Sequence, residues 1–233
     1  MSPQSQSLVD AIHSETLARS HYVCPVEHSA LQLALKRVMD IVGSVLLLAI
    51  LSPVFLYVAL VVRRDGGDVF YGDRRVGQHG KPFRCLKFRT MVPNANAYLK
   101  ALLESDPILR AEFDENYKLK NDPRVTRIGS FLRRSSLDEL PQLWNVLRGD
   151  MSLVGPRPMD YGEPSRWDGE SLPYYLAVRP GMTGLWQIKG RSSLDYKTRI
   201  EMNIEYVKNW SLLGDIWILL MTPKVVFETD KAA

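Results

Sequence analysis

The sequence predicts an α+β fold that is mostly helical: a membrane re-entrant helix hairpin and a small cytoplasmic domain with a short β-hairpin and interfacial amphipathic helices. Three observations predict it. The run from Ile41 to Val62 carries no charge and is interrupted by Ser52-Pro53. Two short apolar segments, around residues 70 and 85, are separated by glycines and a proline, which is typical of a β-hairpin. Most other apolar residues recur at helical spacing in short segments.

The composition is that of a mildly basic protein. Its 233 residues carry a formal net charge of +4 and a pI near 9.0, which suits an anionic membrane or a phosphorylated substrate. Nucleic acid is disfavoured as a partner, because the basic residues lack an aromatic pattern for base stacking. Cys24 and Cys85 match no metal-ligand spacing, so they predict reduced thiols in a protein that faces the cytosol. Residues 1–30 are polar and resemble no secretory signal, which predicts a mobile tail.

The uncharged run is long enough to cross a bilayer. As a helix it would extend about 33 Å, against about 30 Å for the hydrocarbon core. Pro53 cannot donate a hydrogen bond to the carbonyl of Ala49, so a kink is expected there, at a cost of about 3 kcal/mol in an ordinary helix. The hydroxyl of Ser52 can bond a carbonyl that the kink leaves free.

Basic residues flank this run on both sides. Lys36 and Arg37 precede it, and Arg63 and Arg64 follow it. Positive charge favours the cytoplasmic side of a membrane, so both ends are expected there. A helix that enters, bends at Ser52-Pro53 and returns would satisfy both ends. A kinked span and a buried helix of a soluble protein remain alternatives.

Local signals place the other elements along the chain. Strands are predicted at 69–71 and 83–88, and helices at 94–104, 107–120, 126–134, 140–147 and 198–207. The segment 150–190 is rich in glycine and proline, which predicts an ordered loop. The apolar segment 210–227 contains Trp210, Trp217 and Asp215, which favours a helix in the membrane interface over a span. Packing of that helix into the core is the alternative.

Asp138 and Glu139 form a pair of adjacent carboxylates at the expected start of a helix. If Ser136 is the N-cap, the pair belongs to a capping box. If Asp138 is the N-cap, Pro141 falls at the third helical position, where it removes no hydrogen bond. Two adjacent carboxylates repel each other unless a cation offsets them, and Mg²⁺ held together with substrate phosphates would do so.

Arginines accompany the carboxylate pair in the sequence. Arg133 and Arg134 precede it, and Arg157 stands between Pro156 and Pro158. The two prolines stiffen the backbone there, so the guanidinium of Arg157 is presented to an anion with little entropy left to lose. Spacing alone leaves two interpretations open: simple helix capping, or a site that handles phosphate through a metal.

Several long motifs follow one another in a fixed order along the chain. They are Lys36-Arg37-Val38-Met39-Asp40, Ser52-Pro53, Lys87-Phe88-Arg89-Thr90-Met91, Asp122-Pro123-Arg124-Val125-Thr126, Ser136-Leu137-Asp138-Glu139-Leu140-Pro141-Gln142, Gly149-Asp150-Met151-Ser152-Leu153-Val154-Gly155-Pro156-Arg157-Pro158 and Arg179-Pro180-Gly181-Met182-Thr183-Gly184. With these motifs the chain resembles the bacterial sugar transferases, the monotopic polyprenol-phosphate phosphoglycosyl transferases. The resemblance runs from about residue 33 to about residue 228.

The resemblance implies an enzyme that acts on a UDP-sugar and undecaprenyl phosphate. Asp138 would attack the β-phosphate, release UMP and carry the sugar as a covalent aspartyl phosphosugar, which undecaprenyl phosphate then accepts. Glu139 would hold Mg²⁺. By motif position, four basic residues would contact the phosphates or the nucleotide: Lys87, Arg133, Arg157 and Arg191. By analogy with members that start exopolysaccharide synthesis, galactose-1-phosphate or glucose-1-phosphate is the expected cargo.

The resemblance also implies an organisation in three parts. Residues 1–32 would form a mobile tail, 33–65 a re-entrant membrane helix turned by Ser52-Pro53, and 66–233 a catalytic domain with a C-terminal interfacial helix. The catalytic domain is expected on the cytoplasmic face of the bacterial inner membrane. Membrane lipid, downstream glycosyltransferases and a second copy of the chain are the expected partners.

One position departs from the family pattern. Twelve residues after Arg191, where the family usually has an aspartate, this chain has Asn203, with Glu201 and Glu205 as the nearest replacements. The departure keeps an alternative open, a non-catalytic membrane-associated scaffold or regulator of polysaccharide synthesis. An ordinary nucleotide-sugar glycosyltransferase is disfavoured, because the sequence has no Asp-x-Asp metal motif.

Overall fold

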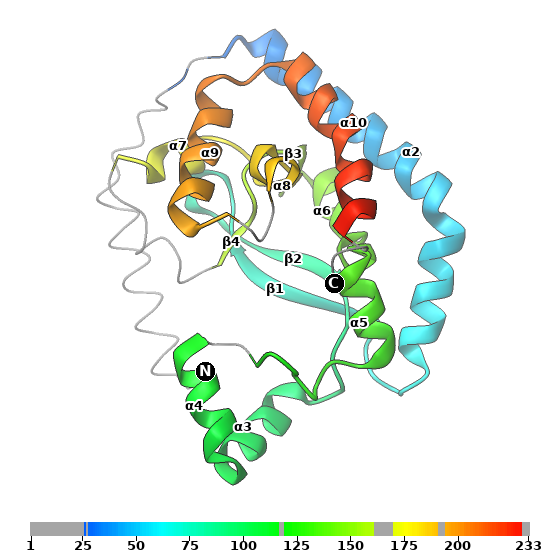
Figure 1. The fold of residues 1–233 in the computed structure, drawn as a ribbon. Coiled ribbons are helices and arrows are strands. Elements are labelled where there is room, and N and C mark those ends of the chain that lie inside the picture. The colour runs from blue at the N-terminus through cyan, green and yellow to red at the C-terminus, as the bar shows by residue number, and fades with distance from the viewer. Residues whose placement is uncertain (1–25, 27, 117–118, 161–169, 191–193, 230–233) are drawn as a thin grey trace.

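The computed structural model describes residues 26, 28–116, 119–160, 170–190 and 194–229. One long helix, α2 (Ala30–Arg63), arches along one side of a body built from the other elements, and α10 (Leu212–Thr229) lies beside its first half (Figure 1). The fold is α+β and mostly helical, as predicted, with a small sheet inside the body. The predicted tail, residues 1–32, lies outside the described residues except for its last few positions.

α2 begins at a capping box and continues across its proline. The side chain of Ser29 accepts a hydrogen bond from the backbone N–H of Gln32 over 3.2 Å, and Gln32 returns the bond over 3.0 Å. The hydroxyl of Ser52 donates to the carbonyl of Ala49 over 2.9 Å. This is the predicted hydrogen bond to the carbonyl that receives none from Pro53, because proline has no backbone N–H. α2 is one continuous helix of 34 residues. The helix alone does not define on which side of a membrane its ends lie, so the re-entrant hairpin stays a prediction.

Protein leaves most of the apolar side chains in the middle of α2 uncovered. Ile50 is 71% exposed and Leu46 is 56% exposed, whereas the buried residues of α2 lie toward its two ends. Among the described residues, α2 is the one helix long and apolar enough to cross a membrane. Its uncovered middle is the surface that a bilayer would have to cover.

The sheet is a β-hairpin with a short third strand. β1 (Phe70–Val76) pairs antiparallel with β2 (Pro82–Phe88), and β4 (Met159–Asp160) pairs antiparallel with the other edge of β1. β3 (Ser152–Val154) and β5 (Gly181–Thr183) form a separate parallel pair. The predicted hairpin is confirmed, although β1 is longer than predicted because its second half also pairs with β2.

Helices complete the body. Their bounds are α3 (Ala95–Ser105), α4 (Pro107–Asn116), α5 (Arg127–Arg134), α6 (Gln142–Arg148), α7 (Leu172–Ala177), α8 (Leu185–Lys189) and α9 (Tyr196–Lys208). The side chains of Asp106 and Thr126 accept hydrogen bonds from the first turns of α4 and α5 and so cap these helices. The prediction of a loop at 150–190 is wrong in part, because this segment contains β3, β4, α7, β5 and α8. Its strands depend on distant partners, such as Ser152 with Gly181.

Buried apolar side chains fix α6 against the hairpin. Leu143 and Val146 of α6 belong to one core cluster with Cys85 of β2 and Val154 of β3. A second cluster joins the last turns of α2 to β2 and α5 through Val58, Val62, Phe88 and Leu132. The core therefore holds the start of α6 beside β2, and the two adjacent carboxylates lie just before this helix.

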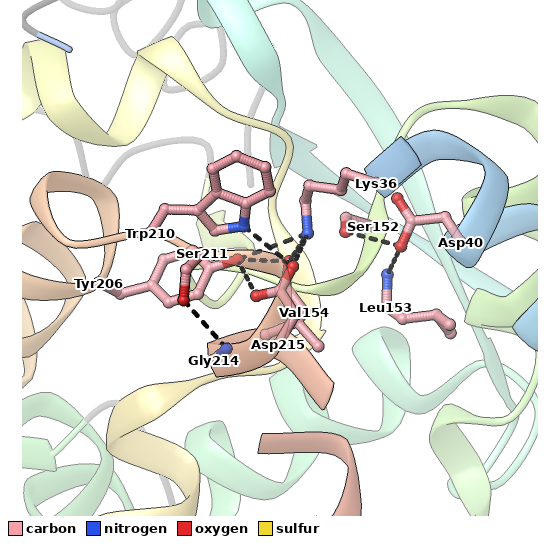
Figure 2. A network of polar contacts seen from close by, with 10 residues as sticks. All are labelled: Lys36, Asp40, Ser152, Leu153, Val154, Tyr206, Trp210, Ser211, Gly214 and Asp215. Carbon is pink, nitrogen blue, oxygen red and sulfur yellow. Dashed lines mark hydrogen bonds and ion pairs between the residues drawn. The ribbon is translucent and has the colours of Figure 1, made fainter. Parts of the chain in front are cut away.

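A buried polar junction joins the first half of α2 to α10 (Figure 2). Lys36 Nζ lies 2.6 Å from Asp215 Oδ2 and donates to the carbonyl of Val154 over 3.0 Å. The Tyr206 hydroxyl donates to Asp215 Oδ1 over 2.8 Å, and Trp210 Nε1 donates to Oδ2 over 3.0 Å. Asp215 is fully buried. The junction thus ties α2, β3, α9 and α10 together.

Candidate active site

The two adjacent carboxylates lie in a short turn between α5 and α6. Ser136 has a left-handed backbone conformation with φ of 56°, and the 3-10 turn Leu137–Glu139 follows it. Leu137 and Leu140 pack against the apolar core, which anchors the turn on both sides of the pair. Neither predicted capping register is found, because α6 begins after Pro141 and the Ser136 side chain makes no capping hydrogen bond. The left-handed residue reverses the chain before the helix can start.

Asp138 is a buried carboxyl with a perturbed acidity. Only 8% of the residue is exposed. Burial raises its pKa to about 6, and the neighbouring charge of Glu139 adds to the rise, whereas Lys87 and Arg133 oppose it. A carboxylate that is poorly solvated and weakly paired is more basic than an ordinary aspartate, so Asp138 is suited to act as a nucleophile near neutral pH.

Glu139 is held between two basic side chains. Lys87 Nζ donates to Glu139 Oε1 over 2.7 Å, and Arg157 Nη2 lies 3.7 Å from the same oxygen. Burial would raise the pKa of Glu139, but the charges of Arg157 and Lys87 outweigh it and hold the pKa below its usual value. Glu139 therefore remains ionised under conditions in which Asp138 is partly protonated.

Arg133 approaches the pair from the last turn of α5. Its Nε donates to the hydroxyl of Thr90 over 2.9 Å. α5 can lie this close to Thr90 because residue 129 is glycine: a Cβ at Gly129 would come within 2.0 Å of the Thr90 carbonyl oxygen. The close approach places the Arg133 charge within reach of Asp138, where it lowers the pKa.

A small cleft adjoins Glu139. Its lining residues are Arg75, Cys85, Lys87, Glu139, Gln142, Arg157, Pro158 and Met182. Burial raises the pKa of the Cys85 thiol to about 11, so the thiol stays protonated and is a poor nucleophile. The cleft is thus a mainly cationic site with one carboxylate.

Sequence reasoning missed two residues of this cleft. Arg75 is fixed by Asp73 at 2.7 Å and Asp160 at 2.6 Å. A longer predicted β1 would have revealed it, since strand alternation separates neighbouring arginines onto opposite faces. Gln142 belongs to the same motif as the carboxylates, but nothing in the sequence distinguishes its amide from an ordinary helix residue.

The carboxylate pair fits a magnesium ion only if the substrate supplies further ligands. Among the described residues, no three His, Cys, Asp or Glu side chains gather into a metal site. Mg²⁺ commonly uses one or two carboxylates, with substrate phosphates and water completing its shell. Asp138 and Glu139 meet that requirement. Glu139 would have to share its carboxylate between the ion and Lys87.

The structure brings together most of the predicted site. Asp138, Glu139, Lys87 and Arg157 gather at the start of α6, with Arg133 beside them. Arg191 lies outside the described residues. Ser52 and Pro53, where a kink was predicted, lie within the continuous helix α2, in its uncovered part.

Asn203 is buried on α9, with 8% of the residue exposed. The two candidate replacements for the missing aspartate are engaged elsewhere. Glu201 lies 4.0 Å from Lys197, and Glu205 lies 3.7 Å from Lys189. Both glutamates are exposed, so neither takes the inward position of Asn203.

Comparison with known proteins identifies the family. The model of the bacterial sugar transferase family matches residues 31–229. The chain is 56% identical over 198 residues to the undecaprenyl-phosphate galactose phosphotransferase of Salmonella typhimurium, covering 85% of this chain and 41% of that protein. It is 50% identical over 188 residues to the exopolysaccharide production protein ExoY of Sinorhizobium fredii, covering 80% and 83%. It is 40% identical over 196 residues to the UDP-glucose:undecaprenyl-phosphate glucose-1-phosphate transferase of Escherichia coli, covering 81% and 39%.

These relatives differ in length from the chain. It spans about two fifths of the Salmonella and Escherichia proteins and most of the Sinorhizobium protein. The family match covers nearly all of the described residues, including both carboxylates and the whole of α2 except its first residue. The chain therefore belongs to the bacterial sugar transferase family.

Proposed function

We propose that this protein transfers a sugar-1-phosphate, galactose-1-phosphate or glucose-1-phosphate, from a UDP-sugar to undecaprenyl phosphate. The observation that carries the proposal is the buried carboxyl of Asp138, with its pKa raised to about 6, beside a Glu139 that Lys87 and Arg157 keep ionised. The names of the Salmonella and Escherichia relatives support the choice of substrates.

In the first step a carboxylate oxygen of Asp138 forms a bond to the β-phosphorus of the UDP-sugar. The bond from that phosphorus to the oxygen bridging the two phosphates breaks, and UMP leaves with the electron pair. The product on the protein is an aspartyl phosphosugar. Lys87, Arg133 and Arg157 offset the negative charge that builds up on the phosphates.

In the second step an oxygen of undecaprenyl phosphate attacks the same phosphorus. The bond to Asp138 breaks, the carboxylate is regenerated, and a diphosphate-linked sugar is released into the membrane. A carboxylate nucleophile divides one difficult displacement into two easier ones. Mg²⁺ held by Glu139 and the substrate phosphates would neutralise further charge during both steps.

The proposal includes the place where the reaction occurs. The uncovered apolar middle of α2 and the exposed Leu213, Trp217 and Leu220 of α10 would lie in the bilayer and its interface. α2 would be re-entrant, with the catalytic domain at the cytoplasmic face of the inner membrane. The reaction would be the first membrane step of exopolysaccharide or another glycan synthesis, with downstream glycosyltransferases as consumers of the product and a homodimer as an expected assembly.

The test is UMP release by the purified protein in lipid nanodiscs that contain undecaprenyl phosphate and Mg²⁺. UDP-galactose and UDP-glucose are offered in turn, and Asp138→Asn is the control. We expect UMP with one of the two sugars and none from the variant. Without acceptor lipid, intact-mass measurement should detect the protein plus a sugar phosphate.

Two results would contradict the proposal. Release of UDP in place of UMP would indicate a glycosyltransferase without a covalent intermediate. No nucleotide release across a wider panel of UDP-sugars would favour the membrane scaffold or regulator.

A further inference from the structure

The two amide side chains on the short helix α6 differ in their hydrogen bonds to the rest of the protein. Gln142 is 2% exposed and Asn145 is 1% exposed. The carbonyl oxygen of Asn145 accepts from the backbone N–H of Leu86 over 2.9 Å, and its amide nitrogen donates to the carbonyl of Arg84 over 2.8 Å and to Asp150 over 3.2 Å. Asn145 therefore has a structural explanation, because it joins α6 to β2.

Gln142 has no such explanation. Its side chain lines the cleft beside Glu139, and none of the hydrogen bonds formed within the described part of the chain involves its amide. The amide is not among the buried polar atoms that lack a partner in the described part of the chain, so it is open to the cleft and water can satisfy it in the empty protein. An amide that no protein group engages and that faces a cationic cleft is free to hydrogen-bond a ligand bound there.

The chemistry of the cleft indicates which part of the ligand that partner is. Arg75, Lys87 and Arg157 supply positive charge for phosphate oxygens. An amide is neutral and offers two donors and an acceptor, which matches a hydroxyl group that both donates and accepts. Gln142 also follows Asp138 by only four residues, so its amide is close in the chain to the group that would carry the phosphosugar.

We propose that Gln142 hydrogen-bonds a hydroxyl group of the transferred sugar and so contributes to the choice of sugar. This inference rests on the proposed function, since it assumes that a UDP-sugar occupies the cleft. Gln142 is then a substrate-binding residue that contributes affinity in the complex.

The experiment compares Gln142→Met with Asn145→Leu, which removes the satisfied amide of the same helix. Each protein is measured in nanodiscs without ligand for Tm, and with UDP-galactose, UDP-glucose and UDP for affinity. UMP release gives kcat/KM for both sugars. Gln142→Met should leave Tm nearly unchanged, lower kcat/KM about tenfold for the preferred sugar and leave the affinity for UDP unchanged. Asn145→Leu should lower Tm.

The opposite results separate the inference from the proposed function. A lower Tm for Gln142→Met would make its amide structural, and unchanged kinetics and affinities would remove it from the site. An equal loss of affinity for UDP and UDP-sugar would move the contact to the phosphates or the nucleoside and overturn the sugar assignment. If the unmodified protein released no UMP, the proposed function would fail, while the comparison of UDP-sugar with UDP would still decide whether Gln142 contacts a sugar.

Discussion

Asp138 and Glu139 are adjacent in the sequence, yet their environments move their pKa values in opposite directions. Asp138 is buried, and the positive charges of Lys87 and Arg133 offset only part of the effect of burial, so its pKa rises to about 6. Glu139 is matched by Arg157 and Lys87, and its pKa falls. Pairs of carboxyl groups that are separated in this way commonly divide two tasks between them. Here one group would react with phosphorus, and the other would stay charged to position cations.

The pH dependence of the reaction should follow Asp138. Its carboxylate becomes available as the pH rises through about 6, so kcat/KM for UMP release should increase through that value and level off near pH 7. The measurement is the initial rate between pH 4.5 and 8 at low UDP-sugar concentration. A midpoint near pH 4, the value for an ordinary aspartate, would show that burial does not control the nucleophile.

Replacement of Asp138 should stabilise the fold at high pH. Its folded pKa of about 6 exceeds the ordinary value of 3.8, so the carboxyl destabilises the folded state increasingly as the pH rises between these values. The penalty at pH 8 is at most about 3 kcal/mol, from about two pKa units at ~1.4 kcal/mol each. Asp138→Asn should therefore have a higher Tm than the unmodified protein at pH 8, and the gain should disappear at pH 4.

Asp122 is the matched control for this stability measurement. Burial would raise its pKa, but the hydrogen bonds from Arg124, the closest at 2.6 Å, outweigh burial and lower it. Its carboxylate stabilises the fold above pH 4, so Asp122→Asn should lower Tm at pH 8. A higher Tm at pH 8 for both Asp138→Asn and Asp122→Asn, or for neither of them, would contradict the opposite pKa shifts of the two carboxyl groups.

At the scale of elements, the end of α2 that precedes the apolar middle is held by charge as well as packing. Lys36 and Asp215 meet in the junction with Tyr206 (Figure 2). One turn further along α2, Asp40 accepts hydrogen bonds from the hydroxyl of Ser152 and the backbone N–H of Leu153, both over 2.9 Å. Ser152 and Leu153 both belong to β3, and the chain continues from β3 to Arg157.

Breaking the junction on one side should be costly. Asp215→Asn leaves the Lys36 ammonium without its counter-charge in a largely buried site, which costs about 3 kcal/mol in comparable cases. The measurement is Tm together with the rate at which a protease cleaves α10. The double variant Lys36→Met, Asp215→Leu removes both charges and should be more stable than Asp215→Asn. If Asp215→Asn had the same Tm and the same rate of protease cleavage as the unmodified protein, the ion pair of Lys36 and Asp215 would contribute little to stability.

Elements with local signals could be predicted, and elements with distant partners could not. The helices predicted at 126–134 and 140–147 are found within two residues of those bounds. Thr126 caps the start of the first, and Gly149 ends the second with a left-handed backbone. The strands around 152 and 181 are three residues long and exist because each pairs with the other, so no local pattern indicated them.

The same distinction applies to the candidate site. The motif and the family resemblance predicted Asp138, Glu139, Lys87 and Arg157 as residues of one site, and the structure places them together. The contribution of Gln142 depends on which neighbours reach its amide, and packing decides that.

At the scale of the whole molecule, an uncovered apolar helix adjoins the body that contains the candidate active site. α2 presents its apolar middle outward, and basic residues flank it at Lys36, Arg37, Arg63 and Arg64. The body packs against one side of α2, at Leu48 and at Val58 and Val62, and leaves most other side chains in the middle of the helix exposed. Figure 1 shows α2 arching along one side of the body. This arrangement suits a helix that dips into one leaflet while both of its ends stay with the body.

The topology can be tested with tags at the two termini. In inverted inner-membrane vesicles, a re-entrant α2 leaves both tags open to protease, whereas a span protects the N-terminal tag. We expect both tags to be cleaved. Pro53→Ala restores the backbone donor to Ala49 and should shift part of the population toward a span. Protection of the N-terminal tag in the unmodified protein would contradict the re-entrant proposal.

The junction between Lys36 and Asp215 joins residues that are 179 positions apart. A ribosome adding about 5 to 20 residues per second needs roughly 10 to 35 seconds to travel that distance. During this interval α2 already exists, but the carboxylate that pairs with its lysine has not been made. The anchor would therefore reach the bilayer first, with an unpaired positive charge that favours the cytoplasmic side. The enzyme would be assembled onto its membrane helix, and α10, made much later than α2, would close the junction.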